Sequence, residues 1–293
     1  MVGRLASALA VLSTLATAAC SVSIAAASGV DMLAVVEPPV ATPVVVRSTP
    51  AAIAVPRPKD ILPWSAAVMA KSDGPGAEDP KCSGSVVAAQ WVLTAGHCQA
   101  SASGSGVQVA VVTGRRDLTR THVGQYLSVD KAVRMPGWLQ QGIGYRNDFT
   151  LLHLSRPTTA PAVALAIPGM AAAFATGSLV RAAGWGALSP NGDPVRVVHS
   201  TTLERLPDSV CATEYGSVFD ARTQLCGGWR WPSMDHDTCN GDSGGPLAMT
   251  INGRVVEVAA TSWGSTCLTE GVPGVYADVA PASSWIASVV SAG

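Results

Sequence analysis

The chain has 293 residues, which is enough for one large domain or two small ones. Charged residues make up only 13% of it, against about 25% in an average soluble domain, and the net charge is −1. This balance argues against a nucleic-acid-binding protein, which needs clustered lysine and arginine. The hydrophobic content of 48% excludes disorder throughout the chain, and 29 glycines with 20 prolines favour β-structure over a helical bundle.

Residues 1–27 have the pattern of a signal peptide. Arg4 is the only charge before Asp31, and a run rich in alanine, leucine and valine separates the two. Ala25-Ala26-Ala27 offers a signal-peptidase site, so we expect export and cleavage there. The alternative is an uncleaved signal anchor, because the uncharged run is long enough to span a bilayer. Its serines and threonines disfavour that alternative.

Residues 28–60 differ in character from the segment before them. Six prolines interrupt a run of alanine, valine and threonine: Pro38, Pro39, Pro43, Pro50, Pro56 and Pro58. Proline fixes φ and removes a backbone donor, so this stretch favours extended, polyproline-like forms. We expect a propeptide or linker over residues 28–60. The domain expected over residues 61–293 is long enough to bury a full core.

Short apolar runs recur through this expected domain, bounded by glycine, proline, asparagine or serine. They are residues 84–87, 91–94, 107–112, 149–154, 179–183 and 255–259. Their length and β-branched content predict strands, and their regular spacing predicts a sandwich or a barrel. The end of the chain differs, because Ser283 or Ser284 is a candidate N-cap for a short helix over about residues 283–291.

The cysteines fit an exported protein. Cys20 lies inside the export segment, and the remaining even set of six suits an oxidising compartment. The six are Cys82, Cys98, Cys211, Cys226, Cys239 and Cys267. Their number allows many connectivities, and composition does not choose among them. Because Cys20 follows two alanines, lipidation of this cysteine is an alternative form of N-terminal processing.

Three motifs contain residues suited to catalysis. Ser243 lies among glycines in the string CNGDSGGP, which begins at Cys239. His97 lies in the string TAGHC after an apparent strand, and Asp148 opens the apolar run of residues 149–154. Alone, such a histidine is more often structural, and such an aspartate is usually a turn or cap residue. Together they offer a nucleophile, a base and an orienting carboxylate, in one of the known chain orders of this triad.

With these motifs the sequence resembles a trypsin-like serine protease of the chymotrypsin family, of the secreted bacterial type. The resemblance extends over roughly residues 62–290 and includes the strings PWSAAV, GWG and SWGS. It implies an all-β, chymotrypsin-like fold of two antiparallel six-stranded β-barrels with a short C-terminal helix. The first barrel is expected over about residues 61–165 and the second over about residues 166–281. The active site would lie in the cleft between them.

The resemblance also implies a role for each site residue. Ser243 would be the nucleophile, His97 the general base, and Asp148 the carboxylate that orients the imidazole. The backbone N–H groups of Gly241 and Ser243 would form the oxyanion hole. By analogy the cysteines pair as Cys82–Cys98, Cys211–Cys226 and Cys239–Cys267. No cofactor is implied, and we expect no metal site, because the histidines other than His97 lack ligand spacing.

The resemblance predicts the specificity as well. In trypsin-like members an aspartate six residues before the catalytic serine lies at the base of the primary pocket, and that position here is Asp237. Gly264 and Gly274 stand at the positions of the pocket walls, where small residues allow a long basic side chain to enter. We therefore expect cleavage after arginine or lysine. The other implied substrate-binding residues are Thr238, Ser262 and Trp263. The alternative is that Asp237 lies on a solvated loop beside Asp235 and His236.

We therefore expect a secreted serine endopeptidase that acts on protein or peptide substrates. Protein protease inhibitors are further candidate partners. We expect no nucleic-acid partner, no stable membrane span in the mature form, and a monomer. One alternative is a catalytically inactive binding protein that keeps the fold, although such relatives usually lack a triad residue. The other is a zymogen-like member, because the family's usual Ile-Val-Gly-Gly start, whose amino group pairs with the position of Asp242, is absent before Pro63.

Overall fold

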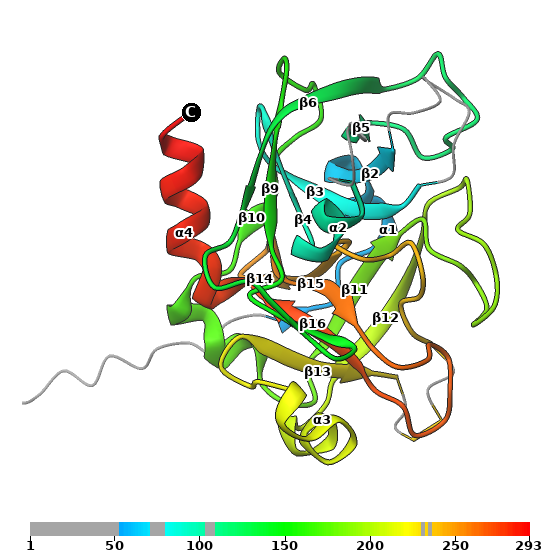
Figure 1. Ribbon diagram of the computed structural model, residues 1–293, viewed down its shortest axis with the longest axis vertical. Coiled ribbons are helices and arrows are strands. Elements are labelled where there is room, and N and C mark those ends of the chain that lie inside the picture. The colour runs from blue at the N-terminus through cyan, green and yellow to red at the C-terminus, as the bar shows by residue number, and fades with distance from the viewer. Residues whose placement is uncertain (1–52, 71–79, 103–108, 230–231, 234–235) are drawn as a thin grey trace, which may run out of the picture. The chain divides into compact units, whose positions relative to one another are not determined.

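The computed structural model describes residues 53–70, 80–102, 109–229, 232–233 and 236–293. The chain divides into Met1–Ser48 and Thr49–Gly293, and all described residues belong to the second unit. The expected signal peptide and most of the expected linker therefore lie outside the described residues. The second unit consists of two barrels and a C-terminal helix (Figure 1). None of the helices in the described ranges is long and apolar enough to cross a membrane.

The first barrel is a closed ring of six antiparallel strands in the order β2-β3-β4-β9-β6-β5. The strands are β2 Ser65–Ala70, β3 Cys82–Ala88, β4 Trp91–Thr94, β5 Val109–Thr113, β6 Gln125–Arg134 and β9 Thr150–Leu154. Val86, Leu127 and Leu152 are buried in its core. Burial of such apolar side chains is the main force that closes the ring.

The second barrel is also closed by six strands, because β14 and β15 pair directly in the order β14-β11-β12-β13-β16-β15. The strands are β11 Leu179–Gly184, β12 His199–Arg205, β13 Gln224–Gly228, β14 Pro246–Ile251, β15 Arg254–Trp263 and β16 Gly274–Asp278. Leu203, Met249 and Val258 lie in its core. Two short strands extend its sheet, β1 Ile53–Ala54 beside β14 and β10 Ala164–Leu165 beside β15.

The remaining elements are short, apart from the last helix. They are α1 Pro58–Ile61, η1 Leu62–Trp64, α2 Gly96–Ala102, β7 Leu139–Gln141, β8 Gly144–Arg146, η3 Pro168–Phe174, α3 Asp208–Tyr215, η4 Gly216–Val218 and α4 Val279–Ser291. Strands β7 and β8 form an antiparallel hairpin of their own. The architecture confirms the predicted all-β fold of two antiparallel six-stranded barrels with a short C-terminal helix.

The C-terminal helix begins earlier than the sequence predicts. Helix α4 begins at Val279, and Asp278 is its N-cap, because the Asp278 side chain accepts a hydrogen bond from Ala280 N at 3.0 Å. The expected cap Ser283 lies inside the helix, where its hydroxyl donates to the carbonyl of Ala280 at 2.7 Å. Aspartate is as good an N-cap residue as serine, so the sequence alone does not distinguish Asp278 from Ser283 as the start of the helix.

The expected linker also ends earlier than residue 60. Strand β1 pairs with Thr250 and Ile251 of β14, and Arg181 of β11 donates to the carbonyl of Pro56 at 3.1 Å. Pro58 stands at the first position of α1, where a missing N–H costs nothing. Pro56 and Pro58, the two prolines of this stretch that the structure describes, therefore lie where the fold tolerates them, and Ile53 and Ala54 extend the second barrel's sheet.

A buried carboxylic acid, Glu257 of β15, lies in the interior. Its side chain is 0% exposed, and neither carboxyl oxygen has a hydrogen-bond partner among the described residues. Burial raises the pKa of Glu257 to about 8, and the Ser85 hydroxyl of the first barrel opposes only part of that rise. The neutral acid is therefore the form that the folded protein holds at neutral pH.

Glu257→Gln is expected to remove a pH dependence of stability. The unfolded chain ionises this acid near pH 4.5, whereas the folded protein keeps it protonated up to about pH 8. The contribution of Glu257 to the free energy of unfolding is therefore fully present below about pH 4.5. It is lost as the pH rises toward 8, by about 1.4 kcal/mol per pH unit. Glutamine carries no proton to lose, so the variant gains stability relative to the wild type between pH 5 and pH 8.

Denaturant unfolding at pH 5, 6.5 and 8 measures this difference in the free energy of unfolding. Glu204→Gln, on the partly exposed face of β12, controls for the loss of one acid. A difference between Glu257→Gln and the wild type that stays constant from pH 5 to pH 8 would contradict the prediction.

Candidate active site

His97 lies in the first turn of helix α2, three residues after the end of β4. The next residue, Cys98, is bonded to Cys82 at the start of β3, which fixes this turn to the barrel. The imidazole remains partly accessible, with 16% of its side chain exposed. One face of the ring stacks on Tyr145 of β8 at a centroid distance of 4.6 Å. The histidine is therefore held in place and still reachable.

Asp148 is buried, with 1% of the residue exposed, and accepts four hydrogen bonds. Its Oδ1 accepts from His97 N at 2.9 Å and from Trp138 Nε1 at 3.1 Å. Its Oδ2 faces His97 Nδ1 at 2.8 Å and accepts from the Ser262 hydroxyl at 2.6 Å. Burial alone would raise the pKa of Asp148, but hydrogen bonds and charge from His97, together with Ser262, hold it below its ordinary value. An ionised Asp148 beside Nδ1 leaves Nε2 of His97 as the basic nitrogen.

Ser243 lies on a tight turn before β14, and this turn packs against the segment that carries His97. Gly244 has a left-handed φ of 77°, and a Cβ added to it would lie 2.2 Å from the Thr94 hydroxyl and 2.5 Å from Ala95 N. Only glycine permits so close an approach. The carbonyl of Ser243 also accepts from Ser83 N at 2.8 Å. The structure thus brings the Ser243 turn of the second barrel against the end of β4, next to His97.

The backbone N–H groups of this turn fall into two sets. Those of Asp242 and Gly244 donate to the carbonyls of Cys239 and Thr261, at 2.9 and 2.7 Å. Those of Gly241 and Ser243 donate to no acceptor in the described part of the chain. Two backbone donors without a protein acceptor, one of them on Ser243 itself, are what an oxyanion hole requires.

Asp242, next to Ser243, is buried and held from three sides. Its carboxylate accepts from Gly186 N at 2.8 Å and from Cys239 N at 3.0 Å, and His199 Nε2 of β12 lies 3.8 Å away. Burial raises the pKa of Asp242, and the charge of His199 opposes that rise. His199 therefore lies beside the Asp242 carboxylate, for which the sequence does not show the family's usual N-terminal partner.

A cavity of about 400 Å³ lies beside Ser243. Its lining includes every substrate-binding residue predicted from the sequence: Asp237, Thr238, Ser262, Trp263, Gly264 and Gly274. Ile143 and Tyr145, on the β7–β8 hairpin of the first half of the chain, complete one wall. The motifs do not single out these two residues.

Asp237 lines this cavity and does not lie on a solvated loop. Its carboxylate accepts from Thr238 N at 2.8 Å, from Leu268 N at 3.3 Å and from the Tyr276 hydroxyl at 3.2 Å. No lysine or arginine of the described residues forms an ion pair with it. Burial raises the pKa of Asp237 to about 7 despite these donors. Asp237 is therefore an acidic group of the cavity lining that no lysine or arginine of the described residues neutralises.

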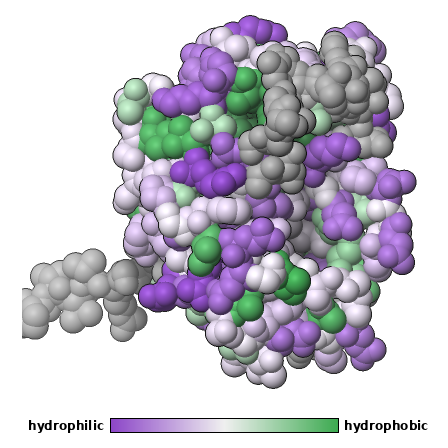
Figure 2. All heavy atoms as spheres, viewed as in Figure 1, coloured by the Kyte–Doolittle hydropathy of each residue, from purple (hydrophilic) through white to green (hydrophobic). Residues whose placement is uncertain are grey.

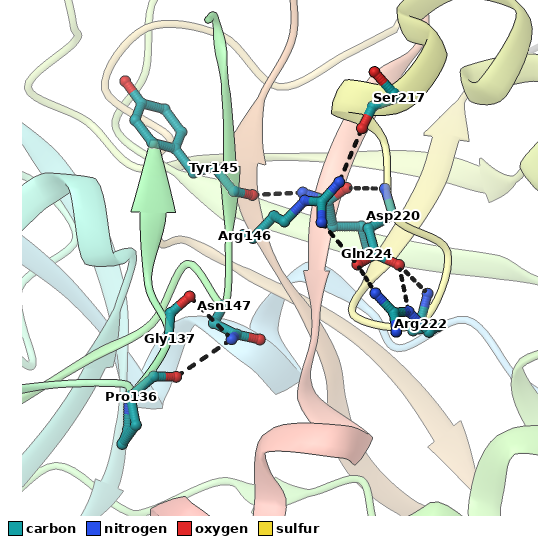
Figure 3. Close-up of polar contacts among 9 residues, drawn as sticks. All are labelled: Pro136, Gly137, Tyr145, Arg146, Asn147, Ser217, Asp220, Arg222 and Gln224. Carbon is teal, nitrogen blue, oxygen red and sulfur yellow. Dashed lines mark hydrogen bonds and ion pairs between the residues drawn. The ribbon is translucent and has the colours of Figure 1, made fainter. Parts of the chain in front are cut away.

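Polar contacts with residues of the second barrel hold the β7–β8 hairpin in place (Figure 3). Arg146 of β8 donates to the carbonyl of Ser217 at 2.9 Å and lies 3.7 Å from Asp220. Gln224 of β13 donates to the carbonyl of Tyr145. These contacts fix Tyr145 against His97. Nothing local in the sequence predicts them, because the partners are separated by 70 residues or more.

The hairpin also contributes two exposed apolar side chains, one of which lines the cavity. Leu139 and Ile143 are 51% and 52% exposed, and Ile143 lines the cavity. On the face drawn in Figure 2, hydrophobic residues form separate patches among hydrophilic ones. An exposed apolar side chain on the lining of a polar cavity, such as Ile143, is suited to contact with a neighbouring residue of a bound peptide.

The structure pairs the cysteines as Cys82–Cys98, Cys211–Cys226 and Cys239–Cys267, the pairing that the resemblance implies. Among the described residues, only Cys82, His97 and Cys98 are spaced as a metal site would be. Two of these ligand atoms are joined in a disulfide, so they are not thiolates.

Comparison with known proteins identifies the family. A model of the trypsin family matches residues 54–286. This chain belongs to the trypsin family. It is 33% identical over 219 residues to trypsin-1 of Astacus astacus, which covers 70% of this chain and 86% of the relative. It is 32% identical over 213 residues to a trypsin-like protease of Streptomyces glaucescens, which covers 72% of this chain and 75% of the relative.

Other trypsin-family relatives are longer. The chain is 32% identical over 219 residues to serine protease 56 of Mus musculus, and this match covers 73% of the chain. It spans only 35% of that relative's length. Among solved structures, mouse neuropsin, a serine protease expressed in the limbic system, matches with a TM-score of 0.65 and 25% identity. That match covers 81% of this chain and 98% of neuropsin.

Proposed function

We propose that this trypsin-family protein is a serine endopeptidase that uses Ser243, His97 and Asp148 as its catalytic triad. The observation that carries the proposal is the buried Asp148 carboxylate 2.8 Å from His97 Nδ1, beside a turn that presents Ser243 from the other barrel. A serine hydroxyl is a poor nucleophile until an oriented base removes its proton. This arrangement supplies that base.

The proposed reaction proceeds in two halves. Ser243 Oγ attacks the peptide carbonyl while His97 Nε2 takes its proton, and the carbonyl oxygen gains charge that the N–H groups of Gly241 and Ser243 stabilise. His97 then gives the proton to the leaving amine, which leaves an acyl group on Ser243. Water, activated by His97, hydrolyses that ester and restores the enzyme. Asp148 stays ionised and stabilises the imidazolium formed in each half.

We propose cleavage after arginine or lysine. Asp237 lies at the cavity base without a cation, and removing a carboxylate from water is costly unless an opposite charge meets it. A bound arginine or lysine side chain would supply that charge, and arginine would do so through paired hydrogen bonds. The absence of a side chain at Gly264 and Gly274, which both line the cavity, leaves room for a long side chain.

We also propose that the protein is exported. Residues 1–27 carry a signal-peptide pattern, and three disulfides fit an oxidising compartment. In this proposal, cleavage occurs after Ala27 and the mature protein is a monomer that acts on protein or peptide substrates, with protein protease inhibitors as further partners.

A panel of chromogenic peptides that differ only in the residue before the scissile bond tests the specificity. Arginine and lysine substrates are expected to show kcat/KM values at least about 100-fold above those with phenylalanine or alanine, because only the cations meet the partly buried Asp237 carboxylate. Benzamidine, a small aromatic cation, is expected to compete with all of them. A panel in which phenylalanine or alanine substrates react faster than arginine substrates would overturn the specificity and leave the triad untouched.

A further inference from the structure

The catalytic carboxylate has a hydrogen-bond donor that the proposed mechanism does not use. Trp138 Nε1 donates to Asp148 Oδ1 at 3.1 Å, and the same oxygen accepts from His97 N at 2.9 Å. An indole N–H donates only and does not titrate in the range where enzymes work. It therefore stabilises the ionised carboxylate at every pH without competing for the proton of His97.

The indole occupies space that a missing side chain provides. A Cβ added to Gly96, the residue before His97, would lie 2.4 Å from Trp138 Cδ1 and 2.6 Å from Nε1. Real Cβ atoms do not approach so closely, so alanine at position 96 would displace the indole. Gly96 and Trp138 thus form a complementary pair, in which one residue provides the room that the other fills.

The turn that carries the indole is fastened to both neighbours of Asp148. Asn147 has a left-handed φ of 48°, which asparagine tolerates better than most residues, and its side-chain amide donates to two carbonyls of the turn of residues 135–138 at 3.2 and 3.3 Å (Figure 3). On the other side, the carbonyl of Phe149 accepts from the first N–H of that turn at 2.9 Å. The position of the indole is therefore set relative to the carboxylate.

Charged and aromatic groups fix the plane of the indole. The Arg134 guanidinium lies 4.3 Å from the centroid of the Trp138 ring. Tyr145 stacks on the indole at 6.1 Å and on the His97 imidazole at 4.6 Å. The ionisable groups that face Asp148 are thus His97 and Tyr145, while Arg134 reaches it only through the indole. This arrangement directs the indole N–H at Asp148.

We propose that Trp138 is a positioning residue of the triad, whose indole N–H fixes the Asp148 carboxylate in the plane that orients His97, and that Gly96 is the residue that admits it. This inference rests on the proposed function. Hydrogen bonds to a charged acceptor are stronger than neutral ones, and a buried carboxylate that loses a donor becomes more basic. A more basic Asp148 stabilises protonated His97, which is the inactive form of the base.

Trp138→Phe removes the N–H and keeps an aromatic ring. We expect kcat to fall about tenfold, KM to change less than twofold, and the acidic limb of the kcat/KM profile to move to higher pH. Trp64→Phe, which alters a buried tryptophan in the core of the same barrel, is the matched control. It is expected to lower thermal stability without moving the pH profile. A Trp138→Phe enzyme with the wild-type kcat and pH profile would overturn the proposal.

A double-mutant cycle tests the coupling between Gly96 and Trp138 separately from the Trp138→Phe variant, so the test does not depend on the folding of that one variant. Gly96→Ala and Trp138→Ala are each expected to lower kcat/KM about tenfold. The double variant is expected to lose less than the product of the two single losses, because no indole remains to be displaced and only the contact of 3.1 Å between the added Cβ and Asp148 Oδ1 remains. Losses that multiply in the double variant would overturn the link between the two residues. A wild type without Ser243-dependent hydrolysis would instead refute the proposed function, so the two failures are distinguishable.

Discussion

Ser243→Ala is expected to lower kcat for peptide hydrolysis by about a millionfold, since the variant lacks the atom that forms the acyl intermediate. The remaining catalysis would come from the oxyanion donors and from substrate binding alone. KM is expected to change little, because the Ser243 hydroxyl is one small group in a cavity lined by many residues. Burst kinetics with an ester substrate would show acyl-enzyme formation in the wild type and none in the variant.

Labelling with an organofluorophosphonate separates catalysis from mere binding. The wild type is expected to be labelled at Ser243 alone, and the Ser243→Ala variant not at all. Ser288→Ala, on the exposed side of α4, is the matched control and keeps both labelling and activity. Wild-type turnover in the purified Ser243→Ala variant would refute the triad. A wild type that binds peptides but is neither labelled nor active would be the inactive binding protein considered above.

Local sequence patterns predict those parts of the site whose residues are close neighbours along the chain or lie at the ends of paired strands. The string around Ser243 combines the proposed nucleophile with Gly241 and Gly244, both at left-handed φ values, so one short motif contains the turn and its proposed donors. His97 follows β4 directly, and Asp148 precedes β9, which pairs with β4 along its length. The register of these two strands brings the histidine and the aspartate together.

The residues that the sequence does not predict reach the site through long-range contacts. His199 meets Asp242 because β12 pairs with β11 and places His199 opposite Gly184, two residues before the glycine whose N–H binds Asp242. Trp138 and Tyr145 reach the site from a turn and a hairpin that have no strong pattern of their own. Such contacts depend on the packing of whole elements, which hydrophobic periodicity does not encode.

The internal partner of Asp242 bears on the zymogen alternative. Family members bring a newly freed chain terminus to this aspartate, whereas here Gly186, Cys239 and His199 already surround it. The Gly241 and Ser243 donors are also without protein acceptors among the described residues. This arrangement favours a site that is formed before any cleavage of the expected propeptide or linker.

Asp237→Ser is expected to lower kcat/KM for arginine substrates by about 1000-fold and to leave alanine substrates almost unchanged. The reason is that truncating one partner of a buried charge pair costs about 2–5 kcal/mol. Serine leaves the cavity open but offers no charge to an incoming guanidinium. Glu214→Ser, which removes an exposed acid from α3 of the same barrel, is the matched control and keeps the arginine preference.

The pH dependence of benzamidine binding tests the same carboxyl group without relying on turnover. With a pKa of about 7, Asp237 of the unliganded protein is protonated and neutral below that pH. A bound cation requires the ionised form, so affinity is expected to rise about tenfold per pH unit from pH 5 to pH 7 and to level off above it. Below pH 7, calorimetry in buffers of different ionisation enthalpy should record the release of one proton on binding. In the Asp237→Ser variant both the affinity and its pH dependence should be lost, and a variant that retains either would show that another group meets the cation.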